Sequence, residues 1–402
     1  MVARHPRARV PRLLVLGAGP AQLGLLEAAR AEGLWTAVAD RDPAAPGFEL
    51  ADNRCIVSTE DEPAIERLAA VLALDGVVAP GTDWPVAVAA RVAHKLGLPH
   101  PISPATAVLA TNKLRQRERF DEAGVPQPRW QFLSDGEPEL ELPCVVKAPD
   151  RQGQKGLSLV LDAAGLDEAI AAARASSRTG AVLIEEVVEG PEVTVIGFSA
   201  AGEFVALAVT DRLTADPPAF GVALAHVFPS PHAEVAANVA RLAVSALGIE
   251  DGPSYTQLRI GPRGPEVMEV AARLGGGHDA ELVRAAVGVD LNSLALAAAL
   301  GEPLTPSRLR LEEGRRPGAA VTRFLVSAPG LLERVVVPDD LEGVVSVRIY
   351  REPGYVIGPF RRGTDRVGAV LAVGATRDEA IARADAAAER IRFVTADAEA
   401  LV

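Results

Sequence analysis

The chain has 402 residues, which at about 150 residues per domain predicts two to three domains. Its 53 Asp and Glu residues outnumber its 41 Lys and Arg residues, and the net charge of −12 argues against a nucleic-acid partner, because such partners select basic surfaces. No stretch reaches the roughly 18 uninterrupted apolar residues of a membrane span. The two cysteines, Cys55 and Cys144, allow neither a disulfide framework nor a CxxC metal site. Composition therefore predicts a cytoplasmic α/β protein without a membrane partner.

The first hundred residues alternate strand and helix patterns. Apolar runs at residues 13–16, 35–39, 55–58 and 76–80 are separated by helical patterns at 21–31, 63–73 and 84–96. Continuous apolar strands between helices indicate a parallel sheet covered on both faces. We therefore expect a Rossmann-like unit over residues 1–104.

A glycine turn follows the first predicted strand. Gly17-x-Gly19, with Asp40 further along the chain, has the form of a dinucleotide fingerprint. The third glycine is absent, because Gln22 occupies its position and the next glycine is Gly24. A tight strand-to-helix turn in a domain that binds no dinucleotide is the better interpretation, and an NAD-dependent oxidoreductase is the alternative.

The middle of the chain places basic residues beside glycines. Strands are predicted at residues 144–148, 159–162, 182–187, 193–198 and 204–209, and Lys147 lies inside the first of these, where an ammonium group is costly unless an anion meets it. The segment 151–156 follows with two glycines and a second ammonium group, that of Lys155. A basic strand residue followed by such a loop can cradle a triphosphate. A solvated loop with a snorkelling lysine is the alternative interpretation.

Acidic residues follow the strand at 182–187. Glu185 can accept a hydrogen bond from an adenine amino group, the backbone of the apolar link after it can bond the ring edge, and Glu192 can hold ribose hydroxyls. A single run of this kind is usually an exposed strand end. Its position after the basic loop favours a nucleotide site.

A predicted hairpin, with strands at 255–260 and 266–271, carries an acid and an arginine. Counting from the turn places Gln257 opposite Glu269, close enough to share a ligand. Alternation along the strand places Glu269, Ala271 and Arg273 on the same face. This pattern predicts a Mg²⁺ ligand beside a group that stabilises an oxyanion, and the glycines at 275–277 predict close approach to a ligand. A surface cross-strand pair is the alternative.

The tail from residue 304 forms a third expected unit. Strands are predicted near residues 320–326, 343–350 and 367–373. A helix follows, because Thr376 and Glu379 have the spacing of a capping box.

In this order the motifs resemble the ATP-grasp superfamily of carboxylate–amine ligases, and most closely its amino-acid (dipeptide) ligase group. The resemblance covers essentially the whole chain. Segment 17–24 is similar to the opening of the family's N-terminal domain. Segments 112–113 and 146–148 are similar to the segments that carry the first and second ATP lysines, and segment 152–156 is similar to the mobile phosphate loop. Segment 185–192 is similar to the adenine and ribose segment, and segment 268–276 to the strand for metal and catalysis. The resemblance implies a Rossmann-like domain (1–104), a central ATP-grasp domain (105–303) with a lid subdomain at about 128–190, and a C-terminal α+β domain (304–402).

The resemblance also implies a set of site residues. The implied ATP contacts are Lys113, Lys147, Gly153, Gln154, Lys155, Gly156, Glu185, Glu186, Val188 and Glu192. Arg273 and Lys155 are the implied catalytic residues, and Glu269 is the implied Mg²⁺ ligand. Gln257 stands where the family usually has a second acid, so one or two Mg²⁺ ions are expected. Ala271 stands where the family commonly has Asn, and it matches the dipeptide-ligase variant. Substrate contacts are expected beside the matched segments, at Asp211, Arg212, Gly276, Gly277 and His278.

The implied reaction activates a substrate carboxylate with ATP as an acylphosphate. An amine then displaces phosphate to form an amide. The alternatives are a bicarbonate-activating carboxylase-type enzyme and a catalytically impaired ATP-binding protein. The expected partners are small carboxylate and amine substrates, and a homodimer is a further expectation.

Overall fold

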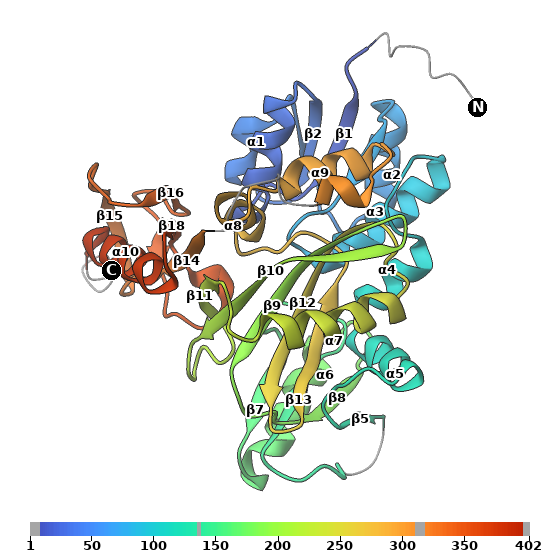
Figure 1. The fold of residues 1–402 in the computed structure, drawn as a ribbon, viewed down its shortest axis with the longest axis vertical. Helices are drawn as coiled ribbons and strands as arrows, with labels where there is room; N and C mark the ends of the chain where they lie inside the picture. The colour runs from blue at the N-terminus through green and yellow to red at the C-terminus, as the bar shows by residue number, and fades with distance from the viewer. Residues whose placement is uncertain (1–8, 135–137, 310–317, 397–402) are drawn as a thin grey trace.

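A computed structural model describes residues 9–134, 138–309 and 318–396. Helices and strands form a mixed α/β fold with four sheets in these ranges, as the sequence predicts (Figure 1). The N-terminal unit, in blue, lies at one end of the molecule, a small green sheet lies at the other, and the orange and red C-terminal strands lie to one side. Within the same ranges no helix is long and apolar enough to span a membrane.

The N-terminal sheet is parallel and has the strand order β3-β2-β1-β4. Its elements are β1 (Arg12–Leu16), α1 (Leu23–Ala31), β2 (Trp35–Asp40), β3 (Asn53–Ile56), α2 (Glu62–Val71), β4 (Gly76–Val78) and α3 (Asp83–Leu96). Leu13 and Val15 of β1 pack in one core with α1, whereas Leu14 and Leu16 pack in another with α2 and α3. Burial on both faces explains why this strand is apolar throughout.

A helix from much later in the chain completes the cover of this sheet. Helix α9 (Leu291–Ala299) packs against α1 and β4 (Figure 1). Gly76 permits the approach, because a Cβ atom there would lie 2.3 Å from the carbonyl oxygen of Ala299. The expected central domain, 105–303, therefore places its last helix on the N-terminal sheet.

The glycine turn after β1 is filled by the protein itself. The side chain of Gln22 lies so close to Gly17 that a Cβ atom there would be 2.9 Å from it, and its amide donates to the carbonyl oxygen of Pro80 at 2.6 Å. The carboxylate of Asp40 accepts from the backbone N–H of Ala18 at 2.8 Å. These contacts agree with a tight structural turn.

Two short helices, α4 (Pro104–Ala110) and α5 (Lys113–Ala123), lead to the small sheet. Asn112 caps α5 by accepting from the backbone N–H of Arg115 at 3.2 Å, and Gly124, in the left-handed region, ends it. The small sheet is antiparallel, with the order β5-β8-β6-β7. It consists of β5 (Trp130–Leu133), β6 (Cys144–Lys147), β7 (Leu157–Val160) and β8 (Val182–Glu186), and α6 (Leu166–Ser176) packs on it.

The large sheet has eight strands in the order β13-β12-β9-β10-β11-β14-β18-β16. Its strands are β9 (Glu192–Ala200), β10 (Glu203–Thr214), β11 (Ala223–Phe228), β12 (Gly252–Gly261), β13 (Gly264–Ala271), β14 (Ala319–Leu325), β16 (Val344–Ile349) and β18 (Gly368–Gly374). Because β11 pairs with β14, the sheet continues across the expected domain boundary at residue 304. Helices α7 (Ala233–Ala246), α8 (Asp279–Ala286) and α10 (Arg377–Arg390) pack against this sheet.

A three-stranded sheet, β17-β15-β19, lies beside the C-terminal end of the large sheet. It contains β15 (Gly330–Val336), β17 (Val356–Ile357) and β19 (Arg392–Ala396), which the sequence analysis did not predict. Half of the predicted capping box of α10 is present, because Thr376 accepts from the backbone N–H of Glu379 at 3.2 Å. The carboxylate of Glu379 accepts in turn from the backbone N–H of Ala375 at 2.6 Å.

The hairpin β12–β13 pairs Gln257 with Glu269, as predicted, but the pair depends on a β-bulge that the prediction did not include. Next to the turn the register pairs Gly261 with Gly264, which alone would place Met268 opposite Gln257. A β-bulge between Gln257 and Leu258 adds one residue on β13 and restores the predicted pair.

Candidate active site

Two adjoining pockets lie where the small sheet, the large sheet and the segment 350–366 approach one another. The first pocket is lined by the small sheet, by residues 151–155 and by parts of β9, β10, β12 and β13. The second pocket is lined by residues 81–83, by β11, β12 and β13, and by Tyr350, Arg351 and Arg366. The two pockets share Gln152, Gly153, Gln154, Arg212, Gln257 and Glu269.

Most of the predicted site residues meet at these pockets. The first pocket is lined by Lys113, Lys147, Gly153, Gln154, Lys155, Glu185, Glu186, Val188 and Glu192. Gly156 does not line this pocket. It ends the loop at 151–156, and its carbonyl oxygen accepts from the backbone N–H of Ala148 at 2.9 Å. The second pocket is lined by Arg212, Arg273, Gly276 and Gly277.

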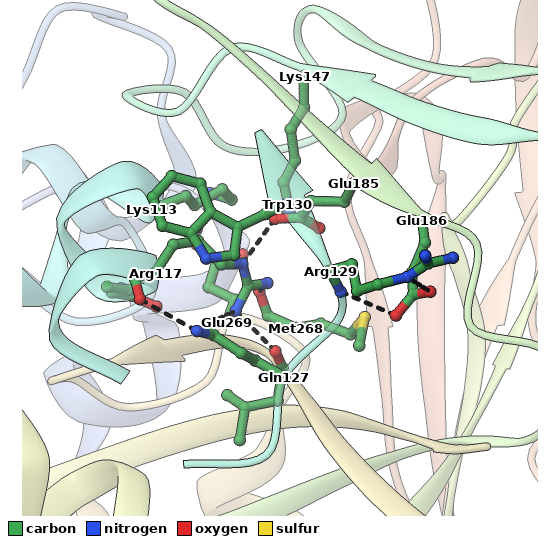
Figure 2. Close-up of polar contacts among 12 residues, drawn as sticks. Lys113, Arg117, Gln127, Arg129, Trp130, Lys147, Glu185, Glu186, Met268 and Glu269 are labelled. Carbon is green, nitrogen blue, oxygen red and sulfur yellow. Dashed lines mark hydrogen bonds and ion pairs between the residues drawn. The ribbon is translucent and has the colours of Figure 1, made fainter. Parts of the chain in front are cut away.

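Lys147 belongs to a buried three-residue charge cluster (Figure 2). Its Nζ lies 2.6 Å from Oε2 of Glu185, and Nε of Arg117 lies 2.7 Å from Oε1 of the same carboxylate. Burial lowers the pKa of Lys147 to about 8, although Glu185 acts in the opposite direction. Burial alone would raise the pKa of Glu185, but Arg117 and Lys147 hold it at about 2. The carboxylate stays ionised and holds the lysine at the pocket wall.

Glu186 follows Glu185 on β8 and carries its carboxylate toward other partners. It accepts from Nε and from the backbone N–H of Arg129, both at 2.8 Å, and it pairs with Arg263. Figure 2 shows Glu186 beside Arg129, on the far side of Glu185 from Lys147. These hydrogen bonds overcome the effect of burial and lower the pKa of Glu186 to about 2. The Glu186 carboxylate is thus engaged in structural ion pairs, and its backbone N–H donates to the carbonyl oxygen of Arg129 at 3.0 Å.

Lys113 and Glu192 both line the first pocket, and both carry charged side chains. Nζ of Lys113, at the start of α5, lies 2.6 Å from Oε1 of Glu269 and donates to the carbonyl oxygen of Arg151 at 2.8 Å. Glu192, at the start of β9, pairs with Nη1 of Arg212 at 2.5 Å and with Arg259 at 3.3 Å. The predicted lysine and glutamate therefore each have a charged partner within the pocket wall.

The loop at 151–156 separates the two pockets. Gly153, Gln154 and Gly156 have φ values of +64°, +61° and +67°, so the backbone turns sharply here. Gln152 accepts from the backbone N–H of Asp83 at 2.5 Å, which ties the loop to the start of α3. The Lys155 side chain lines the first pocket.

Glu269 and Gln257 lie at the boundary of the two pockets, and Arg273 lines the second pocket. Nε of Arg273 lies 2.7 Å from Oδ1 of Asp83, and this pair raises the pKa of Arg273 against the effect of burial. In the part of the chain that the structure describes, no three or more His, Cys, Asp or Glu side chains are grouped to hold a metal ion. A Mg²⁺ ion bound by substrate phosphates needs only one or two protein oxygens. The paired oxygens of Glu269 and Gln257 fit such an ion.

Two predicted substrate contacts lie elsewhere. Asp211 precedes Arg212 on β10, and neighbouring strand residues point to opposite faces, so only Arg212 reaches the pockets. The Asp211 carboxylate instead binds Arg377 and Ser230, both at 2.5 Å. His278 is buried and its Nε2 lies 2.5 Å from the hydroxyl of Tyr350. Neither Asp211 nor His278 lines either of the two pockets.

The sequence analysis missed several residues at the site. Arg117 and Asp83 carry no local signal, because their partners lie 68 and 190 residues away. His226 lines the second pocket, and its Nδ1 lies 2.7 Å from Oδ1 of Asp279. Its Nε2 has no hydrogen-bond partner within the described ranges. The sequence analysis predicted no strand over residues 223–228, so nothing there marked this residue.

Comparisons with known proteins agree with this geometry. A family model for the L-amino acid ligase C-terminal domain 2 matches residues 323–396. An uncharacterized protein of Sinorhizobium fredii is 29% identical over 72% of this chain, and the chain spans 62% of that protein's length. The formate-dependent phosphoribosylglycinamide formyltransferase of Thioalkalivibrio sulfidiphilus is 28% identical over 95% of the chain and 96% of its own length. The L-amino acid ligase of Bacillus licheniformis shares the fold, with a TM-score of 0.82, 23% identity and coverage of 97% of this chain and 100% of that one.

Proposed function

Because the chain belongs to the ATP-grasp superfamily of carboxylate–amine ligases, we propose that it joins a small carboxylic acid to an amine at the expense of ATP. The observation that carries this proposal is the wall shared by the two pockets. Glu269, Gln257 and Arg212 line both, so a group bound in one pocket meets a group bound in the other. This arrangement suits a transfer of phosphate from a nucleotide in the first pocket to an acid in the second.

The first pocket binds ATP in this proposal. Lys113, Lys147 and Lys155 neutralise phosphate charge, and the turned backbone at 152–156 supplies N–H donors. The backbone of residues 186–188 meets the edge of adenine, and Glu192 holds the ribose. Glu185 acts chiefly by keeping Lys147 in place, since both of its oxygens are already paired.

Glu269, with the amide oxygen of Gln257, holds Mg²⁺ on the phosphates. When bound, the ion offsets the negative charge of the phosphates and orients them. Lys113 pairs with Oε1 of Glu269, so the lysine keeps this carboxylate in position and Oε2 is the oxygen that would face the ion. Whether one or two ions bind depends on the neutral side chain of Gln257.

The reaction proceeds in two steps. An oxygen of the substrate carboxylate attacks the γ-phosphorus of ATP, and the bond from that phosphorus to ADP breaks. The nitrogen of the amine then attacks the acyl carbon, and the bond to phosphate oxygen breaks, leaving an amide and inorganic phosphate. Arg273, oriented by Asp83, stabilises the oxyanion of the second step. The loop at 152–156 excludes water, which would otherwise hydrolyse the acylphosphate.

A proton leaves the amine when the amide forms, and His226 takes it. Its Nδ1 is held by Asp279, and Nε2 is buried without a hydrogen-bond partner among the described residues, so Nε2 is the ring nitrogen left to accept the proton. The backbone N–H of Gly277 donates to the other oxygen of Asp279 at 3.0 Å, which fixes the orientation of the pair.

The proposed reaction is tested by ADP release with Mg²⁺ and ATP. The panel contains amino acids, small organic acids and bicarbonate, offered singly and in pairs. An acid and an amine together should release ADP and phosphate, whereas stimulation by bicarbonate alone would indicate carboxylase-type chemistry. AMP as the product, or no turnover with any pair, would refute the ligase mechanism.

Glu269→Gln should abolish turnover while ATP binding survives. Glu234→Gln, at an exposed glutamate of α7 that lines neither pocket, is the matched control and should leave both unchanged. Turnover that persists in Glu269→Gln would show that the metal assignment is wrong.

A further inference from the structure

Arg178, in the turn between α6 and β8, joins the small sheet to the N-terminal unit. Its Nη2 lies 2.8 Å from Oε1 of Glu60, and its guanidinium lies 3.9 Å from the centre of the Trp84 ring. Glu60 lies just before α2, and Trp84 lies in the first turn of α3. The arginine side chain is 23% exposed. The contact therefore combines an ion pair with a cation–π interaction that is partly shielded from water.

The small sheet and α6 form a unit, here called the small-sheet unit, with an apolar core of its own. Among the described residues, the buried side chains of this core all come from residues 133–184. The core does not extend into the N-terminal unit, whose described apolar residues belong to two other clusters. Individual contacts such as that of Arg178 therefore set the position of the small-sheet unit on the N-terminal unit.

The turn that carries Arg178 is tied to both ends of the loop that separates the two pockets. Just before the loop, the buried carboxylate of Asp150 accepts from the backbone N–H of Arg178 at 2.9 Å. Nε of Arg151 donates to the carbonyl oxygen of Ser176 at 2.5 Å. At the far end of the loop, a Cβ atom on Gly156 would lie 2.6 Å from Cβ of Ser176, so the two backbones are in close contact. The turn and the loop are therefore expected to move together.

The middle of the same loop contacts the N-terminal unit beside Trp84. The side-chain oxygen of Gln152 accepts from the backbone N–H of Asp83, which is the residue before Trp84, at 2.5 Å. The Asp83 carboxylate in turn pairs with Arg273. The turn and the loop are thus both attached to the first turn of α3, and displacing Arg178 from Trp84 would draw the loop away from Asp83.

We propose that Arg178 is a positioning residue, whose contact with Trp84 and Glu60 fixes the loop at 151–156 against the start of α3. With the contact made, the loop covers the boundary of the two pockets and keeps water from the bound phosphates. With the contact broken, Asp150 still holds the turn to the loop, but neither is fixed to the N-terminal unit. The inference rests on the proposed function for the reaction that the loop protects, whereas the position of the loop can be measured without turnover.

Hydrogen–deuterium exchange of the full chain, with ADP and Mg²⁺ present, tests how firmly the loop is held. In Arg178→Met we expect the backbone amides of residues 151–157 and of the start of α3 to exchange about 3- to 10-fold faster, because a cation–π interaction and an ion pair are lost. The amides of β14 and β18 should exchange at unchanged rates. That comparison separates release of the loop from a general loss of stability.

Arg174→Met is the matched control, because Arg174 is an exposed arginine of α6 whose hydrogen bond, to the carbonyl oxygen of Ser134, lies within the small-sheet unit. It should leave the exchange rates unchanged. Arg178→Lys keeps a charge for Glu60 but not a planar group for Trp84, and it should give an intermediate rate. In a Trp84→Leu background, Arg178→Met should have a smaller effect than it has alone, because its stacking partner is already gone.

The proposed reaction supplies a second measurement. If water reaches the acylphosphate when the loop is loose, Arg178→Met should raise the ratio of ADP released to amide formed, and Arg174→Met should not.

Equal loop exchange in Arg178→Met and Arg174→Met would overturn the inference, and so would fully additive effects of the changes at Arg178 and Trp84. Failure of the proposed function has a different signature. Faster loop exchange in Arg178→Met, without amide formation from any substrate pair, would keep the positioning role and refute the ligase reaction.

Discussion

Replacing Arg117 tests how the buried charge cluster supports the nucleotide pocket. Arg117 is 0% exposed and bonds the Glu185 carboxylate at 2.7 Å. It also donates to the carbonyl oxygens of Val267 and Met268, at 2.8 and 2.7 Å. Arg117→Met keeps the side-chain volume but removes all of these donors.

The expected loss of stability follows from these contacts. Removing one partner of a buried ion pair costs about 3–5 kcal/mol. Each orphaned carbonyl adds about 1–3 kcal/mol when taken alone, but such losses are not additive, and Lys147 still compensates Glu185. We therefore expect Arg117→Met to lower the free energy of unfolding by about 3–5 kcal/mol.

The assay is urea unfolding followed by tryptophan fluorescence and by circular dichroism, with coincident transitions required for a single free energy. Arg115→Met is the control on the same helix, because the Arg115 side chain is 61% exposed and its pair with Glu118 is 3.8 Å long. The control should change stability by less than about 0.5 kcal/mol. A loss below about 1 kcal/mol in Arg117→Met would refute the view that the cluster is tightly coupled.

Three further predictions concern the pockets themselves. ATP binding should weaken by up to about tenfold per pH unit above pH 8, because Lys147, with a pKa of about 8 instead of 10.5, must take up a proton from water when phosphate binds. ATP titrations across this range check it, and Lys147→Arg should lose the dependence. Gln257→Glu should tighten Mg²⁺ binding to the ADP complex several-fold in a metal titration, since it adds a carboxylate opposite Glu269. Asp83→Asn should lower kcat by about 10- to 100-fold with unchanged ATP affinity, because Arg273 loses the partner that orients it; an unchanged kcat in steady-state kinetics would contradict this role.

Residue types within single predicted strands and loops were enough to predict several residues that line the first pocket. An ammonium group inside an apolar strand requires an anion, and Lys147 does have one at 2.6 Å. The anion is Glu185, which the sequence analysis assigned to adenine instead. Pairing between two different strands cannot be read from either strand alone, because it depends on the order β8-β6 in the small sheet.

The register of the hairpin shows a different limit. Counting from the turn predicted the pair Gln257 and Glu269, yet the turn contains two residues and a β-bulge supplies the extra one. A bulge changes the alternation of faces without a fixed residue type, so nothing in residues 255–271 marks it. For Asp211 and Arg212 the same alternation was the overlooked signal, since successive side chains of a strand point to opposite faces of the sheet.

The charges that line the two pockets are arranged differently from the charge of the chain as a whole. The net charge of −12 is a property of the whole chain, whereas the charges at the pocket boundary cancel pairwise, as Lys113 with Glu269 and Arg273 with Asp83 do. Paired groups hold their geometry whichever substrate binds, so they suit the chemistry common to all substrates.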